Sequence, residues 1–256
     1  MARIIAVANQ KGGVGKTTTS INLAASTAEL GRRVLLIDMD PQGNATMGSG
    51  VNKQDVRLSC YDVLLDECSP FEAIVNPGNI KHHVLPANMD LAGAEVHLLE
   101  AENRDSRLKR AINQMSADYD YVFIDCPPSM NMLTLNALVA ADSVLVPMQC
   151  EYFALEGLSS LMNTLKQIQD TVNENLALEG LLRTMFDGRS RLTREVSDQL
   201  TIHFSDRLFE TVIPRNIRLA EAPSFGLPAI LYDKSSRGAQ AYMDLANELD
   251  EKHYQD

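Results

Sequence analysis

The residue run with the clearest chemical meaning is Lys11-Gly12-Gly13-Val14-Gly15-Lys16-Thr17-Thr18. It follows a strand-like apolar run and precedes a helical pattern, which is the context that a phosphate-binding loop requires. The glycines allow backbone N–H groups to turn toward phosphate oxygens, and the start of the helix directs its positive dipole end at the same anion. Lys16 can reach the β- and γ-phosphates of a nucleotide, and the Thr17 hydroxyl can ligate Mg²⁺.

Lys11 is a departure from the usual loop pattern G-x-x-x-x-G-K-[ST]. Gln10 stands where that pattern has its first glycine, and Lys11 follows it. A second cation in such a loop indicates that its charge is used. The alternative is a Gly-rich structural turn with two solvated lysines, and the flanking strand and helix patterns disfavour it.

Two aspartates follow apolar runs at positions suited to phosphate chemistry. Asp125 comes directly after the run 121–124, and Asp40 lies just past the run 34–37, beside Asp38. Because the carboxyl ends of parallel strands meet at one edge of a sheet, we expect Asp125 near the phosphate and in the Mg²⁺ shell. Asp40 could orient or deprotonate an attacking water. Turn and capping roles beside the prolines that follow are the alternatives.

Strand-like and helical runs alternate along the whole chain. We expect strands over residues 4–8, 34–37, 84–86, 121–124, 144–146, 178–186 and 211–213. We expect helices over residues 17–30, 61–65, 70–75, 95–115, 130–140, 155–169, 191–204 and 238–252. This alternation predicts right-handed βαβ units, and so an α/β fold with a mostly parallel twisted sheet and helices on both faces. The chain shows no repeat and no linker, which favours one domain over residues 1–256.

Composition narrows the possible functions. The chain has 256 residues, of which 45% are hydrophobic and 22% charged, and this excludes wholesale disorder and a fibrous repeat. With 23 Lys plus Arg against 34 Asp plus Glu, the formal charge is −11. An overall basic nucleic-acid surface is therefore excluded, whereas a local basic patch is not.

Cysteine usage and the first residues indicate a cytoplasmic protein. The four cysteines contain no C-x-x-C pair and are far apart, so we expect reduced thiols: Cys60, Cys68, Cys126 and Cys150. Met1 leads directly into a strand-like run, and we therefore expect no targeting segment. The longest weakly charged stretch, 126–150, is interrupted by three prolines and an aspartate, so no membrane span is expected.

These motifs together resemble the deviant-Walker NTPases, which include the partition ATPase family called ParA or Soj. The matching pieces are KGGVGKTTT at 11–19, DMDPQGNAT at 38–46, DCPPS at 125–129 and TVIPRNIRLAEAPSFG at 211–226. The first piece marks the superfamily, whereas DPQGN and IPRN point to the ParA branch. The resemblance spans nearly the whole chain and implies a single ATPase domain of the P-loop NTPase type.

The resemblance also implies roles in ATP hydrolysis. Lys11 looks like the signature lysine, which crosses to the partner's nucleotide in an ATP-sandwich homodimer. Asp40 looks like the hydrolytic aspartate of the first switch loop, and Asp125 looks like the Walker B residue. Lys11, Lys16 and Asp40 are thus the expected catalytic residues, with Thr17 and Asp125 as Mg²⁺ ligands and residues 11–18 around ATP.

Further residues are implied to contact adenine and DNA. Pro214 and Asn216 look like adenine contacts, with Met185 near the base. Arg189 and Arg218 resemble family arginines that bind duplex DNA without sequence preference. The ATP-bound dimer would bind DNA on the nucleoid, and a ParB-type partner on DNA would stimulate hydrolysis and release.

Charge alone supports DNA binding only weakly. The segment 183–218 holds seven Arg and no Lys against five acidic residues, a net charge of +2, and scattered solvated arginines are the alternative. Dimerisation would strengthen the case, because two modest patches on one face add their phosphate contacts and counterion release.

Three other classes of the superfamily remain as alternatives. Positioning ATPases of the MinD type carry a basic amphipathic C-terminal helix, whereas the residues after Gly238 include five acidic side chains and a single lysine. Iron–sulfur reductases need cysteines placed to share a cluster, and only Cys126 and Cys150 could meet at a dimer axis. A nucleotide-gated scaffold with little turnover would share the same loop.

Overall fold

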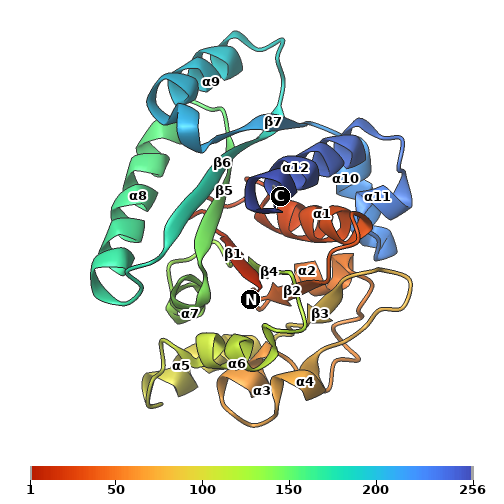
Figure 1. The fold of residues 1–256 in the computed structure, drawn as a ribbon, viewed down its shortest axis with the longest axis vertical. Coiled ribbons are helices and arrows are strands. Elements are labelled where there is room, and N and C mark those ends of the chain that lie inside the picture. Colours follow the sequence, from red (N-terminus) through yellow and green to blue (C-terminus); the bar gives the residue numbers. More distant parts are fainter. Residues whose placement is uncertain (1, 255–256) are drawn as a thin grey trace.

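The computed structural model describes residues 2–254 and has one sheet of seven parallel strands (Figure 1). The strand order is β3-β2-β4-β1-β5-β6-β7, and each neighbouring pair is parallel. The strands are β1 (Arg3–Val7), β2 (Val34–Asp38), β3 (His83–Leu85), β4 (Tyr121–Asp125), β5 (Ser143–Gln149), β6 (Ala177–Phe186) and β7 (Leu208–Pro214). The predicted α/β class with a parallel sheet is confirmed.

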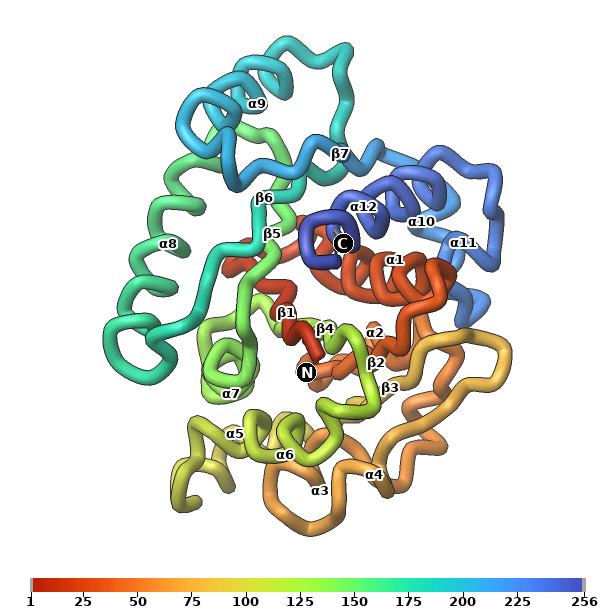
Figure 2. Tube along the Cα trace, in the orientation of Figure 1, coloured from red at the N-terminus to blue at the C-terminus, as the bar shows by residue number. Residues whose placement is uncertain are grey.

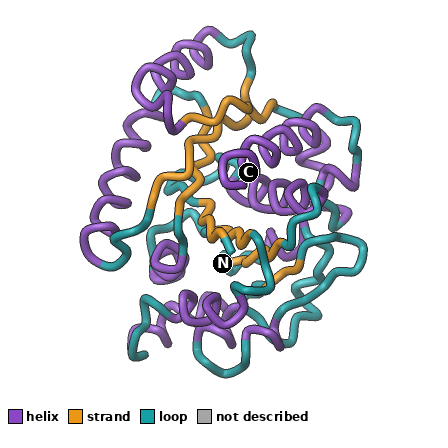
Figure 3. Tube along the Cα trace, viewed as in Figure 1, coloured by secondary structure: helices purple, strands orange, loops and turns teal. Residues whose placement is uncertain are grey.

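Helices cover both faces of this sheet (Figure 3). The longer ones are α1 (Lys16–Glu29), α5 (Leu91–Leu99), α6 (Arg107–Met115), α7 (Met132–Ala140), α8 (Ala154–Thr171), α9 (Arg191–Phe204) and α12 (Arg237–Tyr254). The short ones are α2 (Asn44–Gly48), α3 (Cys60–Leu64), α4 (Pro70–Ala73), α10 (Ile217–Glu221) and α11 (Ala229–Tyr232). Helices α1 and α12 pack on one face, and α5–α8 pack on the other (Figure 2).

The continuous apolar strands explain the two layers. In β1, Ile5 and Val7 point into the core that contains α1 and α12, whereas Ile4 and Ala6 point into the opposite core. Successive side chains of a strand point to opposite faces, so a strand covered on both faces must be apolar throughout. The central position of β1 places the loop that follows it in the middle of the sheet edge.

The prediction of a single helix over residues 95–115 is wrong. Two helices occupy the region, α5 ending at Leu99 and α6 beginning at Arg107. Between them, Asn103 has a φ of 52°, and the Ser106 hydroxyl donates to the Asn103 carbonyl at 3.2 Å. Asn and Ser side chains compete for backbone hydrogen bonds and tolerate the left-handed conformation, so this polar stretch ends the helix.

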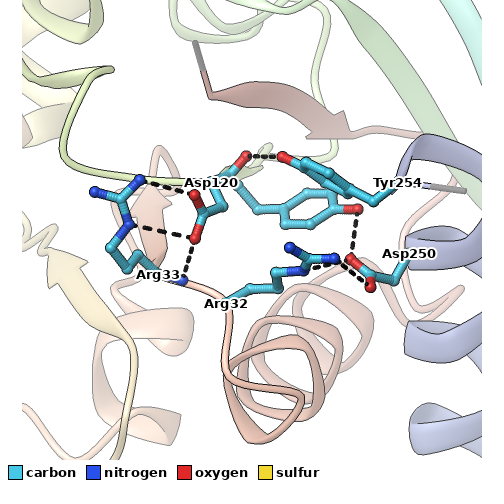
Figure 4. A network of polar contacts seen from close by, with 6 residues as sticks. Arg32, Arg33, Asp120, Asp250 and Tyr254 are labelled. Carbon is cyan, nitrogen blue, oxygen red and sulfur yellow. Dashed lines mark hydrogen bonds and ion pairs between the residues drawn. The ribbon is translucent and has the colours of Figure 1, made fainter. Parts of the chain in front are cut away.

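A charged network ties the end of α1 to the end of α12 (Figure 4). Arg32 donates from Nε and Nη2 to the two carboxylate oxygens of Asp250, each at 2.9 Å, and its guanidinium lies 4.1 Å from the Tyr254 ring centroid. Arg33 pairs with Asp120 at 2.8 Å, and the Tyr254 hydroxyl donates to the Asp120 carbonyl at 3.2 Å. The network fixes the end of α1 that is remote from Lys16.

Candidate nucleotide-binding site

The loop between β1 and α1 forms an anion cradle. Gly13 and Gly15 have φ values of 73° and 88°, which favour glycine. Helix α1 begins at Lys16 without a side-chain cap, so its first backbone N–H groups remain available to an anion. A cavity of about 300 Å³ opens there, lined by Gly12, Gly13, Gly15, Lys16, Thr17, Thr18, Asp40, Pro128 and Met185.

Lys16 is the buried cation of this cavity. The residue is only 7% exposed, and its Nζ donates to the carbonyl of Lys11 at 3.3 Å. Burial lowers the pKa of the Lys16 ammonium, while the nearby carboxyls of Asp125 and Asp40 oppose the shift. A desolvated ammonium of this kind is stabilised by an anion that enters the cavity.

Two buried carboxylates end the neighbouring strands β2 and β4. Asp38 and Asp125 pair in register, and both residues are fully buried. The Ser20 hydroxyl donates to Asp125 Oδ1 at 2.8 Å, whereas Asp125 Oδ2 has no partner among the described residues. Burial, and then repulsion from Asp38, raise the pKa of Asp125. An unpartnered buried carboxylate oxygen beside the phosphate cradle suits a Mg²⁺ ion, which takes oxygen ligands.

Asp38 holds the segment that carries Asp40. Asp38 Oδ1 accepts from the Asp40 backbone N at 3.1 Å, and Asp38 Oδ2 accepts from the backbone N and hydroxyl of Thr46 at 2.8 and 2.7 Å. The Asp40 side chain lines the phosphate cavity and accepts from the Gln42 backbone N at 2.9 Å. Asp40 is thus held at the cavity that Lys16 and Thr17 also line.

A second cavity of about 250 Å³ adjoins the first and holds the expected base contacts Met185, Pro214 and Asn216. Both cavities are lined in part by Gly15, Thr18 and Met185. Asn216 Oδ1 caps α10 by accepting from Leu219 N at 3.3 Å. Met185 has a φ of 48°, which is strained for a residue with a side chain, and such strain concentrates at binding sites.

Two of the expected loop residues lie outside these cavities. The Val14 side chain is buried, and its carbonyl accepts from the Thr184 hydroxyl at 2.7 Å, so only its backbone belongs to the cradle. The Lys11 side chain turns away from the phosphate cavity, and its Nζ pairs with Glu151 Oε2 at 2.5 Å.

Comparison with known proteins decides the family. A family model described as AAA domain matches residues 2–178. The chain is 53% identical over 249 residues to the sporulation initiation inhibitor protein Soj of Bacillus subtilis, covering 97% of this chain and 98% of Soj. It is 50% identical to the chromosome partitioning protein ParA of Myxococcus xanthus, over 97% of this chain and 88% of that protein. The chain belongs to the ParA/Soj family.

A solved structure that is similar to this ParA/Soj member contains a bound nucleotide and magnesium. It is described as cobyrinic acid a,c-diamide synthase from Mycobacterium smegmatis with bound ATP analog and magnesium. It is 39% identical, covers 100% of this chain and 98% of its own, and has a TM-score of 0.85.

The two arginines expected to bind DNA lie at the same edge of the sheet as the nucleotide cavities. Arg189 follows β6 and is 92% exposed, and Arg218 lies in α10 after β7. Each is ion-paired: Arg189 with Asp187 at 2.9 Å, and Arg218 with Glu221 at 2.8 Å and with Asp233 at 3.2 Å. A phosphate would therefore have to compete with these carboxylates.

Two features of the structure concern the alternative functional classes: the environment of the cysteines and the character of the helices. Cys126 and Cys150 are buried, and burial raises the pKa of both thiols, that of Cys150 to about 11. Over residues 2–254, none of the helices combines the length and apolar character needed to cross a bilayer.

Some residues of the site escaped the sequence analysis. Ser20 lies four residues after Lys16 on the same helix face, and this spacing was the available signal. Gln149 donates from Nε2 to the carbonyl of Gly13 at 3.1 Å, but no local pattern links positions so far apart.

Proposed function

We propose that the chain is an ATP-dependent DNA-partitioning ATPase that hydrolyses ATP to ADP and phosphate. The observation that carries the proposal is the cavity that Lys16, Thr17 and Asp40 line, near an Asp125 oxygen that has no partner in the described part of the chain. The family membership and the neighbouring base-sized cavity support the same function.

Each residue has a defined task in the proposed reaction. The loop N–H groups and Lys16 bind the phosphates, and Pro214 and Asn216 bind the adenine. Thr17 and Asp125 would hold Mg²⁺, which supplies charge neutralisation at the phosphate oxygens when bound. Asp40 orients the attacking water, because it is close to the phosphates without being needed to bind them.

Dimerisation and DNA binding follow from the same proposal. Lys11 reaches the nucleotide of a second copy and stabilises an ATP-bound homodimer. Arg189 and Arg218 of both copies then contact phosphates of duplex DNA, which gives affinity without sequence preference. A ParB-type protein on DNA stimulates hydrolysis and releases the dimer, so the chain associates with the nucleoid only in its ATP state.

DNA binding measured by fluorescence anisotropy tests this function. Two duplexes of unrelated sequence should bind equally with ATP, and neither should bind with ADP or without nucleotide. Arg189→Glu or Arg218→Glu should abolish DNA binding while ATP binding and dimerisation persist. The matched control is Arg110→Glu, an exposed arginine that is also ion-paired but lies in α6.

The outcomes separate the competing functions. Equal DNA affinity with and without ATP would refute the proposal. A protein that binds ATP and DNA, but whose ATP turnover does not rise with DNA and a ParB-type partner, would be a nucleotide-gated scaffold. Binding of the ATP form to anionic vesicles but not to DNA would instead identify a MinD-like positioning ATPase.

A further inference from the structure

The junction between β5 and α8 holds the nucleotide loop by a charged contact. Glu151, two residues after β5, pairs with Lys11 through Oε2 and Nζ at 2.5 Å, and the two side chains are 50% and 48% exposed. Gln149, the last residue of β5, donates to the carbonyl of Gly13 at 3.1 Å. The junction thus contacts the loop twice, and only the contact to Lys11 is an ion pair.

This contact holds the Lys11 ammonium outside the cavity that Lys16 lines. Lys16 lines the phosphate cavity, whereas Lys11 lines a separate hollow of about 30 Å³ together with Phe153. Next to Glu151, the rings of Tyr152 and Phe153 meet edge to face at 4.9 Å and are 77% and 66% exposed. Large exposed aromatic side chains are typical of surfaces that a partner covers.

We propose that Glu151 is a positioning residue, which holds the Lys11 side chain by an ion pair in the nucleotide-free monomer. This ion pair must break before a second copy of the chain can form the dimer. The inference rests on the proposed function, in which Lys11 serves the partner's nucleotide. The single negative charge of Glu151 competes with the phosphates of that nucleotide for one ammonium. A triphosphate carries more negative charge than a carboxylate, so the exchange favours the dimer only when ATP is present.

The size of the effect follows from the exposure of the pair. An exposed ion pair contributes about 0.2–1 kcal/mol, which is roughly a 1.5- to 5-fold change in an equilibrium. A dimer that forms by releasing one such pair in each copy loses the contribution twice. Removing the charge of Glu151 should therefore tighten the dimer by roughly 2- to 25-fold.

The test measures the dimer dissociation constant by analytical ultracentrifugation with a non-hydrolysable ATP analogue. Glu151→Gln should tighten the dimer by the stated factor and leave analogue affinity in the dilute monomer unchanged. The matched control, Glu156→Gln, removes an exposed carboxylate from the first turn of α8 and should change nothing. In a Lys11→Gln background, Glu151→Gln should have no effect, because the partner of the carboxylate is already gone.

Each other outcome overturns the inference. An unchanged dissociation constant, or a tightening that persists in the Lys11→Gln background, would show that Glu151 does not act through Lys11. A weaker dimer would make Glu151 a contact to the second copy instead. A wild-type chain that binds the analogue but stays monomeric would refute the dimer of the proposed function and this inference with it, whereas failure to bind the analogue would also refute the nucleotide site.

Discussion

Two buried carboxylates should respond to neutralisation in opposite directions. Within residues 2–254, Asp125 has one oxygen without a hydrogen-bond partner, and the like-charged Asp38 lies beside it. Glu179 instead accepts hydrogen bonds from Ser143 and Lys252, both at 2.6 Å, and contacts His253 at 3.1 Å. In the nucleotide-free protein, Asp125→Asn should raise the free energy of unfolding, and Glu179→Gln should lower it.

The structure gives the magnitudes. Asp125→Asn keeps the buried polar atoms but removes the charge that burial and Asp38 disfavour, so it should stabilise the fold by about 2 kcal/mol, or about 4–8 °C in Tm. Burial alone would raise the pKa of Glu179, but the bonds from His253, Lys252 and Ser143 lower it from 4.5 to about 2. That shift corresponds to about 3 kcal/mol, and the Glu179 side chain is only 3% exposed, so solvent screens it little.

The pH dependence also differs between the two residues. The pKa of Asp125 is raised in the folded state, so its ionisation costs stability increasingly as the pH rises above about 4. The gain from Asp125→Asn should therefore be larger at pH 7 than at pH 5. The pKa of Glu179 is lowered, so its contribution is complete above pH 4.5 and is lost only as the pH falls toward 2. The loss from Glu179→Gln should therefore become smaller as the pH falls from 4.5 toward 2.

Chemical denaturation with EDTA and no nucleotide measures both differences. Mg²⁺ with ATP should then stabilise the wild type more than Asp125→Asn, because the substituted amide is a poor metal ligand. A lower free energy of unfolding for Asp125→Asn than for the wild type at pH 7 would refute the reasoning, since Asp125 would then be a satisfied structural residue.

Three further predictions concern the proposed reaction. Lys16→Ala should weaken ATP binding roughly 10- to 150-fold by calorimetry, the loss of a charged hydrogen bond, and unchanged affinity would remove Lys16 from the phosphate site. Asp40→Ala should bind ATP and dimerise, with turnover reduced about 10²- to 10⁴-fold; normal turnover would assign the water to another group. Arg189→Gln should flatten the salt dependence of DNA binding by about two units per dimer, and an unaltered slope would place the DNA contacts elsewhere.

The local features of the fold were predictable from the sequence. The loop at 11–18 is encoded by adjacent residues, and the buried strands are continuous apolar runs, so both were recognised and the α/β class is confirmed. The five-residue helices α2 and α10 were not predicted, although α3 and α4, which are as short, were. The break between α5 and α6 was not predicted, because the spacing of apolar residues around it is typical of one continuous helix. The left-handed conformation of Asn103, which lies in the break, is known only from the structure.

The residues of the candidate site could be predicted where they belong to a local sequence motif. Residues that reach the site from distant parts of the sequence could not. Asp40 lies in the phosphate cavity as its position after β2 suggested. Glu151 is 140 positions from Lys11, and nothing in its own neighbourhood indicates an ion pair with the loop. The positive φ of Met185 could not be foreseen either, because methionine ordinarily avoids that conformation.

The central position of β1 also has a consequence for biosynthesis. Among the described strands, residues 3–7 pair with β4 at 121–125 and with β5 at 143–145, so their strand partners are made only after about half of the chain has been translated. At about 5–20 residues per second, the apolar run 4–8 waits roughly 6–24 s for its neighbour. Long-range parallel strand pairing is slow, and the apolar strand β1 stays exposed until its partners are made. We therefore expect the nascent chain to depend on chaperones that bind β1 and prevent aggregation.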